Sequence, residues 1–309
     1  MHNKYVDLFE DTDHFDHAKL MEVLKALSDT YSCFELTYLG SSILGRGIPL
    51  IHVGRGKREV LYVGAHHGME WITSMLLCKF LQETCELFSQ KATIYRHDME
   101  MLLQTHTIYL VPMLNPDGVE YQTHGVKADN PMYDRLLKMN RGSENFSSWQ
   151  ANARGVDLNH NYDAGFSEYK QLEAENDIIS GAPTRYSGEN PESEPEVIAL
   201  CNFIRFHKGL RGILTLHTQG EEIFYKRQER NAPHIEHIAR HLSAVSGYRL
   251  SQAVGLASYG GLSDWCADRL ALPSFTVECG KGVNPLPISD FFPIYVRIRE
   301  MLFRFPTML

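Results

Sequence analysis

The sequence predicts an α/β fold: a mixed, mostly parallel, twisted sheet with helices on both faces. Strand-like segments alternate along the chain with helical ones, and several of the strands are apolar throughout, as strands buried on both faces are. The 309 residues, 43% of them hydrophobic and 22% charged, suit either one large globular domain or two small ones.

The N-terminal half is predicted to begin with a short amphipathic helix at 17–27, because its apolar residues recur at helical spacing. A longer apolar stripe predicts a second helix over 70–89. Apolar runs bounded by turn residues predict strands at 34–39, 48–53, 60–63 and 107–114. The sequence Asn115-Pro116-Asp117-Gly118 then gives a strong turn signal.

The C-terminal half follows a segment, 120–193, that is polar and rich in Asn, Ser and Gly. A stretch of that length is too long for an ordinary connection, so we expect it to have a functional role. Beyond it, short apolar runs predict strands at 212–216 and 274–277. Helical periodicity predicts helices at 195–206, 233–246, 262–269 and 290–303.

The charge pattern excludes several classes of function. The formal net charge is −8 and no Lys/Arg cluster interrupts it, so nucleic acid and anionic membranes are not expected partners. Acidic residues run through the first sixteen positions, so no signal peptide is expected, and we predict a cytoplasmic location. The six cysteines form no Cys-x-x-Cys pair and are expected to be reduced.

A histidine and a glutamate three residues apart follow one of the predicted strands. His67 comes directly after the apolar run, and Glu70 lies in the first turn of the next helix. At this spacing an imidazole and a carboxylate can face one point, as zinc ligands do. A buried histidine beside a helix-capping glutamate is the alternative. The same spacing recurs at His97 and Glu100, where the polar surroundings predict a solvated surface.

Two further polar residues end apolar strands. His217 closes the strand at 212–216, and Glu278 closes the strand at 274–277. Catalytic residues of such folds sit at the carboxyl ends of strands, so His217 becomes the candidate third ligand of one zinc ion per chain. Such a site leaves a fourth position for water. A carboxylate at the end of an apolar strand is costly without a partner, so Glu278 is the candidate general base, and then acid.

The long polar segment holds the remaining candidates. Asp157 could accept the free N–H of a zinc-bound His67, and Asn159 could donate to a substrate carboxylate. Arg141 is a candidate for polarising the scissile carbonyl. The alternatives are a solvated turn for the first two residues and a surface ion pair for Arg141.

These blocks together resemble the zinc carboxypeptidase family typified by carboxypeptidase A, from about Gly40 to the C-terminus. The resemblance implies a single α/β/α catalytic domain over 1–309, with 1–33 as a helical lead-in, and a mixed eight-stranded sheet. The resemblance also implies that His67, Glu70 and His217 are the zinc ligands. It implies catalytic roles for Arg141 and Glu278. The matching segments are His67-Gly68-Met69-Glu70-Trp71, Asn115-Pro116-Asp117-Gly118, Gly155-Val156-Asp157-Leu158-Asn159, Gly260-Gly261-Leu262-Ser263-Asp264-Trp265 and Phe275-Thr276-Val277-Glu278.

The sequence departs from the family pattern at two substrate-binding positions. His160 stands where the exopeptidases place the arginine that clamps a C-terminal carboxylate, and histidine lacks the bidentate fork. The mobile pocket tyrosine falls on Leu256, with Tyr259 near but out of register. Asn159, His160, Tyr259 and Asp264 are therefore the expected substrate contacts, and the usual grip on a free C-terminus is in doubt.

This combination is similar to the bacterial γ-D-glutamyl-L-diamino acid peptidases of the same family. That branch implies cleavage of the γ-D-glutamyl–meso-diaminopimelate bond in peptidoglycan stem peptides, with small peptides or muropeptides as substrates. An ordinary metallocarboxypeptidase and an N-acyl amino acid deacylase remain the enzyme alternatives. An inactive zinc-containing peptide-binding module is the alternative of another class.

Overall fold

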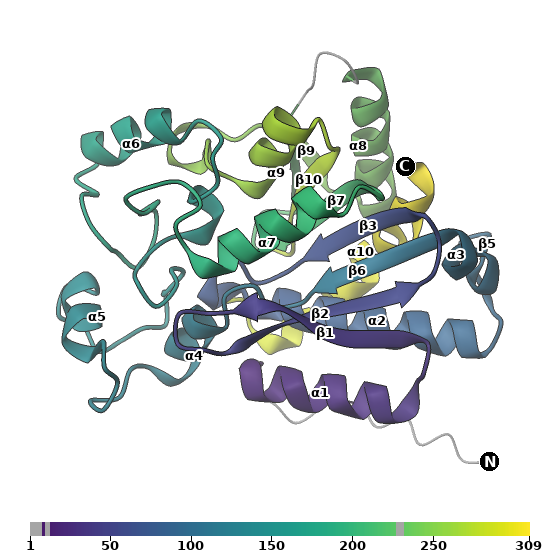
Figure 1. Ribbon diagram of the computed structural model, residues 1–309, viewed down its shortest axis with the longest axis horizontal. Coiled ribbons are helices and arrows are strands. Elements are labelled where there is room, and N and C mark those ends of the chain that lie inside the picture. Colours follow the sequence, from purple (N-terminus) through teal and green to yellow (C-terminus); the bar gives the residue numbers. More distant parts are fainter. Residues whose placement is uncertain (1–7, 10–12, 227–231) are drawn as a thin grey trace.

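The computed structural model describes residues 8–9, 13–226 and 232–309. Its centre is an eight-stranded mixed sheet (Figure 1). The strands lie side by side in the order β1 (Phe34–Ser41), β2 (Gly47–Gly54), β6 (His106–Val111), β3 (Arg58–Val63), β7 (Leu210–His217), β10 (Ser274–Glu278), β8 (Glu222–Tyr225) and β9 (Arg249–Ser251).

Helices cover both faces of this sheet. One buried cluster packs the sheet against α1 (His17–Thr30), α2 (Ile72–Ser89), α3 (Met99–Thr105), α8 (Ala232–Ser246) and α10 (Phe291–Arg304). A second buried cluster joins the opposite face to α7 (Pro195–Phe206) and α9 (Leu262–Trp265). In Figure 1, α7 crosses in front of the sheet, and α2 and α10 lie behind it.

The predicted α/β fold is confirmed, and the central strands explain the position of the polar residues. β6, β3, β7 and β10 run parallel, so their carboxyl ends meet at one edge of the sheet. Glu278 pairs in register with His217 at that edge. Phe275 and Val277 of β10 are fully buried in the apolar cluster on one face of the sheet, whereas Thr276 and Glu278 line the cavity.

Several local predictions from the sequence were incomplete. Residues 90–100, read as polar surface around His97, include the short strands β4 (Thr93–Ile94) and β5 (His97–Asp98), and α3 begins within this stretch. Buried leucines of α3 hold it against the sheet, a tertiary contact that the short polar window did not reveal. The last two strands of the sheet order, β8 and β9, are too short to give a periodic signal.

The turn predicted at Asn115 is instead the start of a helix, α4 (Pro116–His124). Asn115 Oδ1 accepts a hydrogen bond from the Gly118 N–H at 2.9 Å, and Pro116 occupies the first helical turn, where its missing N–H costs nothing. The long polar segment also contains α5 (Tyr133–Met139) and α6 (Phe166–Glu175). It carries its own apolar cluster around Tyr121, Phe146 and Trp149, so much of it is folded rather than loop-like.

Two properties of the whole chain follow from the described residues. None of their helices is both long and apolar enough to span a bilayer. All six cysteines are free thiols, and all but Cys33 are buried, where they pack as small apolar side chains.

Three buried carboxylates meet beside the N-termini of α4 and α7. Asp117 accepts hydrogen bonds from Ser42 Oγ and Arg46. Glu196 accepts longer ones, from the Ile43 N–H at 3.3 Å and Asn152 Nδ2 at 3.4 Å. Burial raises the pKa of Glu196 to about 8, and the neighbouring charges of Asp117 and Glu194 act in the same direction. The folded chain therefore favours the protonated form of this side chain.

We expect Glu196→Gln to stabilise the fold at alkaline pH. Between the ordinary glutamate pKa of 4.5 and about 8, the folded chain holds a proton that the unfolded chain releases, so stability falls as pH rises through that window. The glutamine variant should match the parent near pH 4.5 and exceed it by on the order of 5 kcal/mol at about pH 9. Denaturant unfolding across this range measures the difference. Glu189→Gln, at an exposed position, is the control. Equal pH profiles for Glu196→Gln and the parent would contradict the assignment.

Candidate metal centre and active site

The chain between β3 and α2 is shaped to present His67 and Glu70. Gly68 begins the short helical turn η1 (Gly68–Glu70) and lies against the backbone of α4. A Cβ atom at Gly68 would lie 2.3 Å from the Gly118 carbonyl oxygen, so only glycine allows this approach. Asn115 Nδ2 donates to the His66 carbonyl at 3.1 Å and fixes the strand end that precedes the turn.

His67, Glu70 and His217 converge although 147 residues separate the last two. Nδ1 of His67 lies 2.9 Å from Glu70 Oε1, and Nδ1 of His217 lies 3.0 Å from Glu70 Oε2. Ligands of a tetrahedral zinc ion stand about 3.3 Å apart when each bond is roughly 2.0–2.1 Å. All three side chains are buried, and their ligand atoms lie within 4.8 Å of one another. Two imidazoles and one carboxylate therefore fit a zinc ion in both chemistry and spacing.

Asp157 holds the far side of the His67 ring, as expected. His67 Nε2 lies 3.0 Å from Asp157 Oδ1. Burial alone would lower the pKa of His67, but the carboxylates of Glu70 and Asp157 raise it well above its ordinary value. Burial would likewise raise the pKa of Glu70, yet the two histidines lower it to about 2. The site is thus a buried, negatively polarised pocket of the kind that attracts a divalent cation.

His66 is a part of this site that sequence reasoning missed. Its fully buried ring stacks on the ring of His217 with centroids 5.1 Å apart. Its Nε2 lies 3.0 Å from the Tyr162 hydroxyl, and its Nδ1 lies 3.3 Å from Thr215 Oγ1. Burial lowers the pKa of His66 well below its ordinary value, and the charge of His217 adds to this effect. A neutral His66 therefore supports the third ligand without competing for the ion.

Glu278 stands between the three ligands and a large cavity. It ends β10 beside His217, lines the cavity and is partly exposed to it. Burial raises the pKa of Glu278 well above its ordinary value, and the charge of Glu70 raises it further. A carboxyl group in this position can exchange a proton with a molecule bound between the ligands and the cavity.

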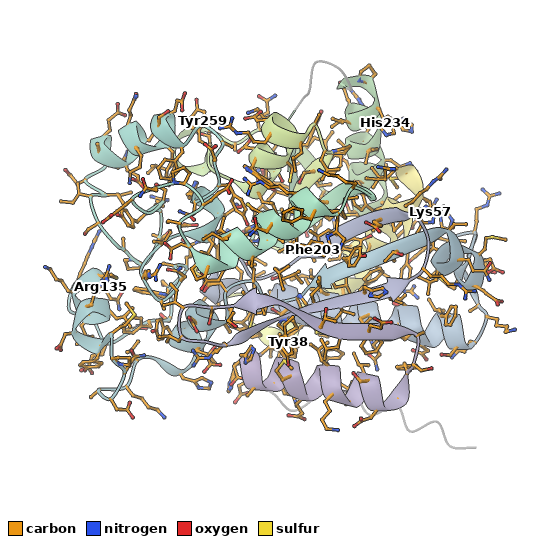
Figure 2. All side chains as sticks on the ribbon, in the orientation of Figure 1. Tyr38, Lys57, Arg135, Phe203, His234 and Tyr259 are labelled. Atoms are coloured by element: carbon orange, nitrogen blue, oxygen red, sulfur yellow. The ribbon has the colours of Figure 1, made fainter. Side chains whose placement is uncertain are left out.

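The cavity itself measures about 1230 Å³ and includes three of the residues expected to bind substrate. Asn159 lines it, with Oδ1 accepting from the Leu262 N–H at 3.2 Å, which leaves its amide N–H groups as the donors it can offer. Asp264 also lines it, and burial raises the pKa of that carboxyl group. Tyr259 is 42% exposed on the same wall, next to α6 (Figure 2).

The structure does not bring His160 or Arg141 to this cavity. The His160 ring stacks on Tyr169 with centroids 4.0 Å apart, and its Nδ1 lies 2.9 Å from the Tyr259 carbonyl oxygen. Burial lowers the pKa of His160, which favours a neutral ring. Arg141 is exposed in the left-handed turn after α5, with φ of 56°, and is not among the residues that line the cavity. Their assigned roles stay predictions, which this placement does not support.

A second group in the described part of the chain could also hold a metal ion. His14, Asp16 and His124 lie together at the surface, with His124 Nε2 2.7 Å from Asp16 Oδ2. All three side chains are partly exposed, and none lines the cavity. This group is therefore less suited to catalysis than the buried one.

Comparisons with known proteins find matches along most of the chain. A family model described as zinc carboxypeptidase matches residues 20–300. Gamma-D-glutamyl-L-diamino acid endopeptidase 1 of Lysinibacillus sphaericus is 35% identical over 91% of this chain and 69% of its own length.

Solved structures agree on the fold. Bovine thrombin-activatable fibrinolysis inhibitor superposes with a TM-score of 0.71 at 20% identity, covering 96% of each chain. Murein-tripeptide amidase MpaA from Escherichia coli O157 superposes with a TM-score of 0.52 at 21% identity, covering 87% of this chain and 91% of the other. At these identities, the two structures support the fold alone.

Proposed function

The chain belongs to the zinc carboxypeptidase family of metallopeptidases, and within that family we propose that it cleaves the γ-D-glutamyl–meso-diaminopimelate bond of peptidoglycan stem peptides. The observation that carries this proposal is the convergence of three buried candidate ligands, His67, Glu70 and His217, next to a second carboxyl group, Glu278, that lines one cavity. We further propose one zinc ion per chain, held by His67, Glu70 and His217.

The protein's own residues supply the positioning and the proton transfers of this reaction. When bound, zinc supplies a Lewis acid that polarises the scissile carbonyl and lowers the pKa of water. Glu278 takes a proton from the attacking water and passes it to the leaving nitrogen. Asp157 holds the His67 ring in one orientation through its 3.0 Å contact with Nε2. Asn159 offers amide N–H groups to a polar group of the substrate.

Two observations support a γ-D-glutamyl substrate over an ordinary peptide. The relative at 35% identity is named for that bond. In addition, position 160 carries a histidine whose ring packs on Tyr169, so it gives no arginine clamp for the C-terminus of a common L-peptide. Action on soluble muropeptides in the cytoplasm stays a prediction, which cell fractionation would check.

We expect the zinc-loaded enzyme to cleave L-Ala-γ-D-Glu-meso-diaminopimelate and to release the diamino acid. Peptides with a free aromatic or basic L-residue at the C-terminus, and N-acyl amino acids, should be cleaved at least about 100-fold more slowly, because a mismatched substrate leaves buried polar groups unpaired. Mass spectrometry of timed digests measures both. The same tripeptide linked through the α-carboxyl of D-Glu is the control for the γ bond. Cleavage of the ordinary peptides alone would rule out the wall-peptide substrate.

A further inference from the structure

The cavity wall carries charged side chains of both signs, and one of the two basic ones has no ionic partner among the described residues. Glu222 forms an ion pair with Arg249, and Lys226 pairs with Asp268 at 2.8 Å. Arg185 is the only arginine among the described residues that line the cavity, and no described carboxylate lies within ion-pair distance of it. Its side chain is exposed to the cavity and is free to meet an anion.

The backbone of Arg185 is tied to the metal centre by a single carboxylate. Asp157 Oδ2 accepts from the Arg185 N–H at 3.0 Å, while Oδ1 of the same side chain lies 3.0 Å from His67 Nε2. The Asp157 N–H donates in turn to the Tyr186 carbonyl at 2.7 Å. The position of Arg185 relative to His67 is thus set by the residue that orients the ligand.

The conformation of Arg185 also points to a role. Its φ is 67°, in the left-handed region that favours glycine. The Tyr169 hydroxyl donates to the Arg185 carbonyl at 3.0 Å and helps hold this conformation. A long charged side chain retained at an unfavourable backbone position, beside a reactive centre, is typical of a functional residue.

We propose that Arg185 binds a carboxylate of the substrate next to the scissile bond. This inference rests on the proposed function. A γ-D-glutamyl-diamino acid has a free carboxylate on each side of the amide: the α-carboxylate of D-Glu and the carboxylate beside the leaving nitrogen. The planar guanidinium of Arg185 can hold either one through two parallel hydrogen bonds. The anion-binding role thus belongs to position 185 rather than to His160, whose ring packs on Tyr169.

The kinetic test uses Arg185→Gln and Arg185→Lys on three substrates. These are the tripeptide, its analogue with the D-Glu α-carboxylate replaced by a carboxamide, and its analogue with the carboxylate beside the leaving nitrogen replaced in the same way. Arg185→Gln should raise KM for the tripeptide about 10–100-fold and change kcat by less than about threefold, because the ion pair forms before the reaction and persists through it. The KM of Arg185→Lys should lie between those of the wild-type enzyme and Arg185→Gln, since lysine keeps the positive charge but not the two parallel N–H donors.

The amidated analogues identify which carboxylate is bound. The wild-type enzyme should discriminate against one of them, and Arg185→Gln should lose that discrimination. Arg249→Gln removes an arginine near the cavity that already has a partner, and it should leave KM within about threefold of the wild-type value. An unchanged KM in Arg185→Gln on all three substrates would overturn the proposal. An equal fall in the kcat of Arg185→Gln on all three substrates would also overturn it, because that result indicates a role at the reacting carbonyl or in folding.

A binding measurement separates this proposal from the proposed function. In the Glu278→Gln background, titration calorimetry gives the Kd of the uncleaved tripeptide with and without Arg185→Gln, and the second change should weaken binding about 10–100-fold. If the wild-type enzyme cleaves only ordinary peptides, the proposed function fails. In that case the Kd values are measured instead for an ordinary peptide that the wild-type enzyme accepts as a substrate and for the C-terminal amide of that peptide. Weaker binding of the free-acid peptide alone by Arg185→Gln would still assign Arg185 to a carboxylate.

Discussion

Glu278→Gln is expected to lower kcat by about 10³–10⁴-fold while the protein keeps its zinc and its substrate affinity. The amide has almost the shape of the carboxyl group, so the packing of β10 against β7 is preserved. It cannot, however, take a proton from water or return one to the leaving nitrogen. Because Glu278 is not one of the three converging ligands, removal of its charge should leave the metal content unchanged.

Three measurements on one preparation check this result: zinc content by elemental analysis, single-turnover rate, and Kd for the tripeptide. Glu222→Gln is the matched control, because Glu222 lies opposite Glu278 on the neighbouring strand β8 and lines the same cavity. Its effect on kcat should stay below about tenfold, since Glu222 already pairs with Arg249. Near-normal turnover by Glu278→Gln would defeat the mechanism, and loss of zinc would make Glu278 a ligand instead.

The convergence of His67, His217 and Glu278 was predictable from the sequence because all three positions follow from strand geometry. His67, His217 and Glu278 each end an apolar run, and parallel strands bring their carboxyl ends to one edge. No assumption about loops was needed. Asp157 was also placed correctly beside His67, since a buried ligand histidine needs a partner for its second nitrogen.

The substrate-binding side was less predictable because it depends on irregular segments. Arg141 and Arg185 look alike in sequence, each an arginine in a polar stretch, and an ion pair at the surface is the common outcome for both. Hydrogen bonds from Asp157 and Tyr169 to the 185–186 backbone hold Arg185 at the cavity. These contacts form between residues far apart in sequence, so no local pattern reveals them.

The buried packing of the His160 ring is a related case. In the sequence it occupies a position where relatives carry a charged clamp, and that resemblance favoured a substrate contact. In the fold, Tyr169 of α6 offers a flat partner and the Tyr259 carbonyl offers an acceptor, so a neutral ring satisfies both needs inside the protein. Tertiary packing, rather than the local sequence motif, therefore determines where the His160 ring lies.

His217→Ala is expected to abolish high-affinity zinc binding and, with it, measurable hydrolysis. The change removes one of three ligands and leaves Glu70 Oε2 without its partner. Loss of a group that only orients a ligand weakens metal binding by about 10–100-fold, so loss of a ligand should weaken it by more than about 100-fold. Asp157→Asn should fall within that smaller range, because it keeps the side-chain shape but weakens the contact with His67 Nε2.

Thermal unfolding with and without zinc measures these differences in zinc affinity without relying on activity. Zinc at about 100 times its Kd should stabilise the wild-type fold by roughly 2.7 kcal/mol, and the same zinc concentration should add almost nothing to His217→Ala. His124→Ala is the control, since it removes an imidazole from the partly exposed group with His14 and Asp16 and should leave the zinc-induced shift intact. The reverse pattern, with the shift lost in His124→Ala and kept in His217→Ala, would assign the ion to the surface group. It would also leave Glu278 without the neighbouring cation on which the reaction depends.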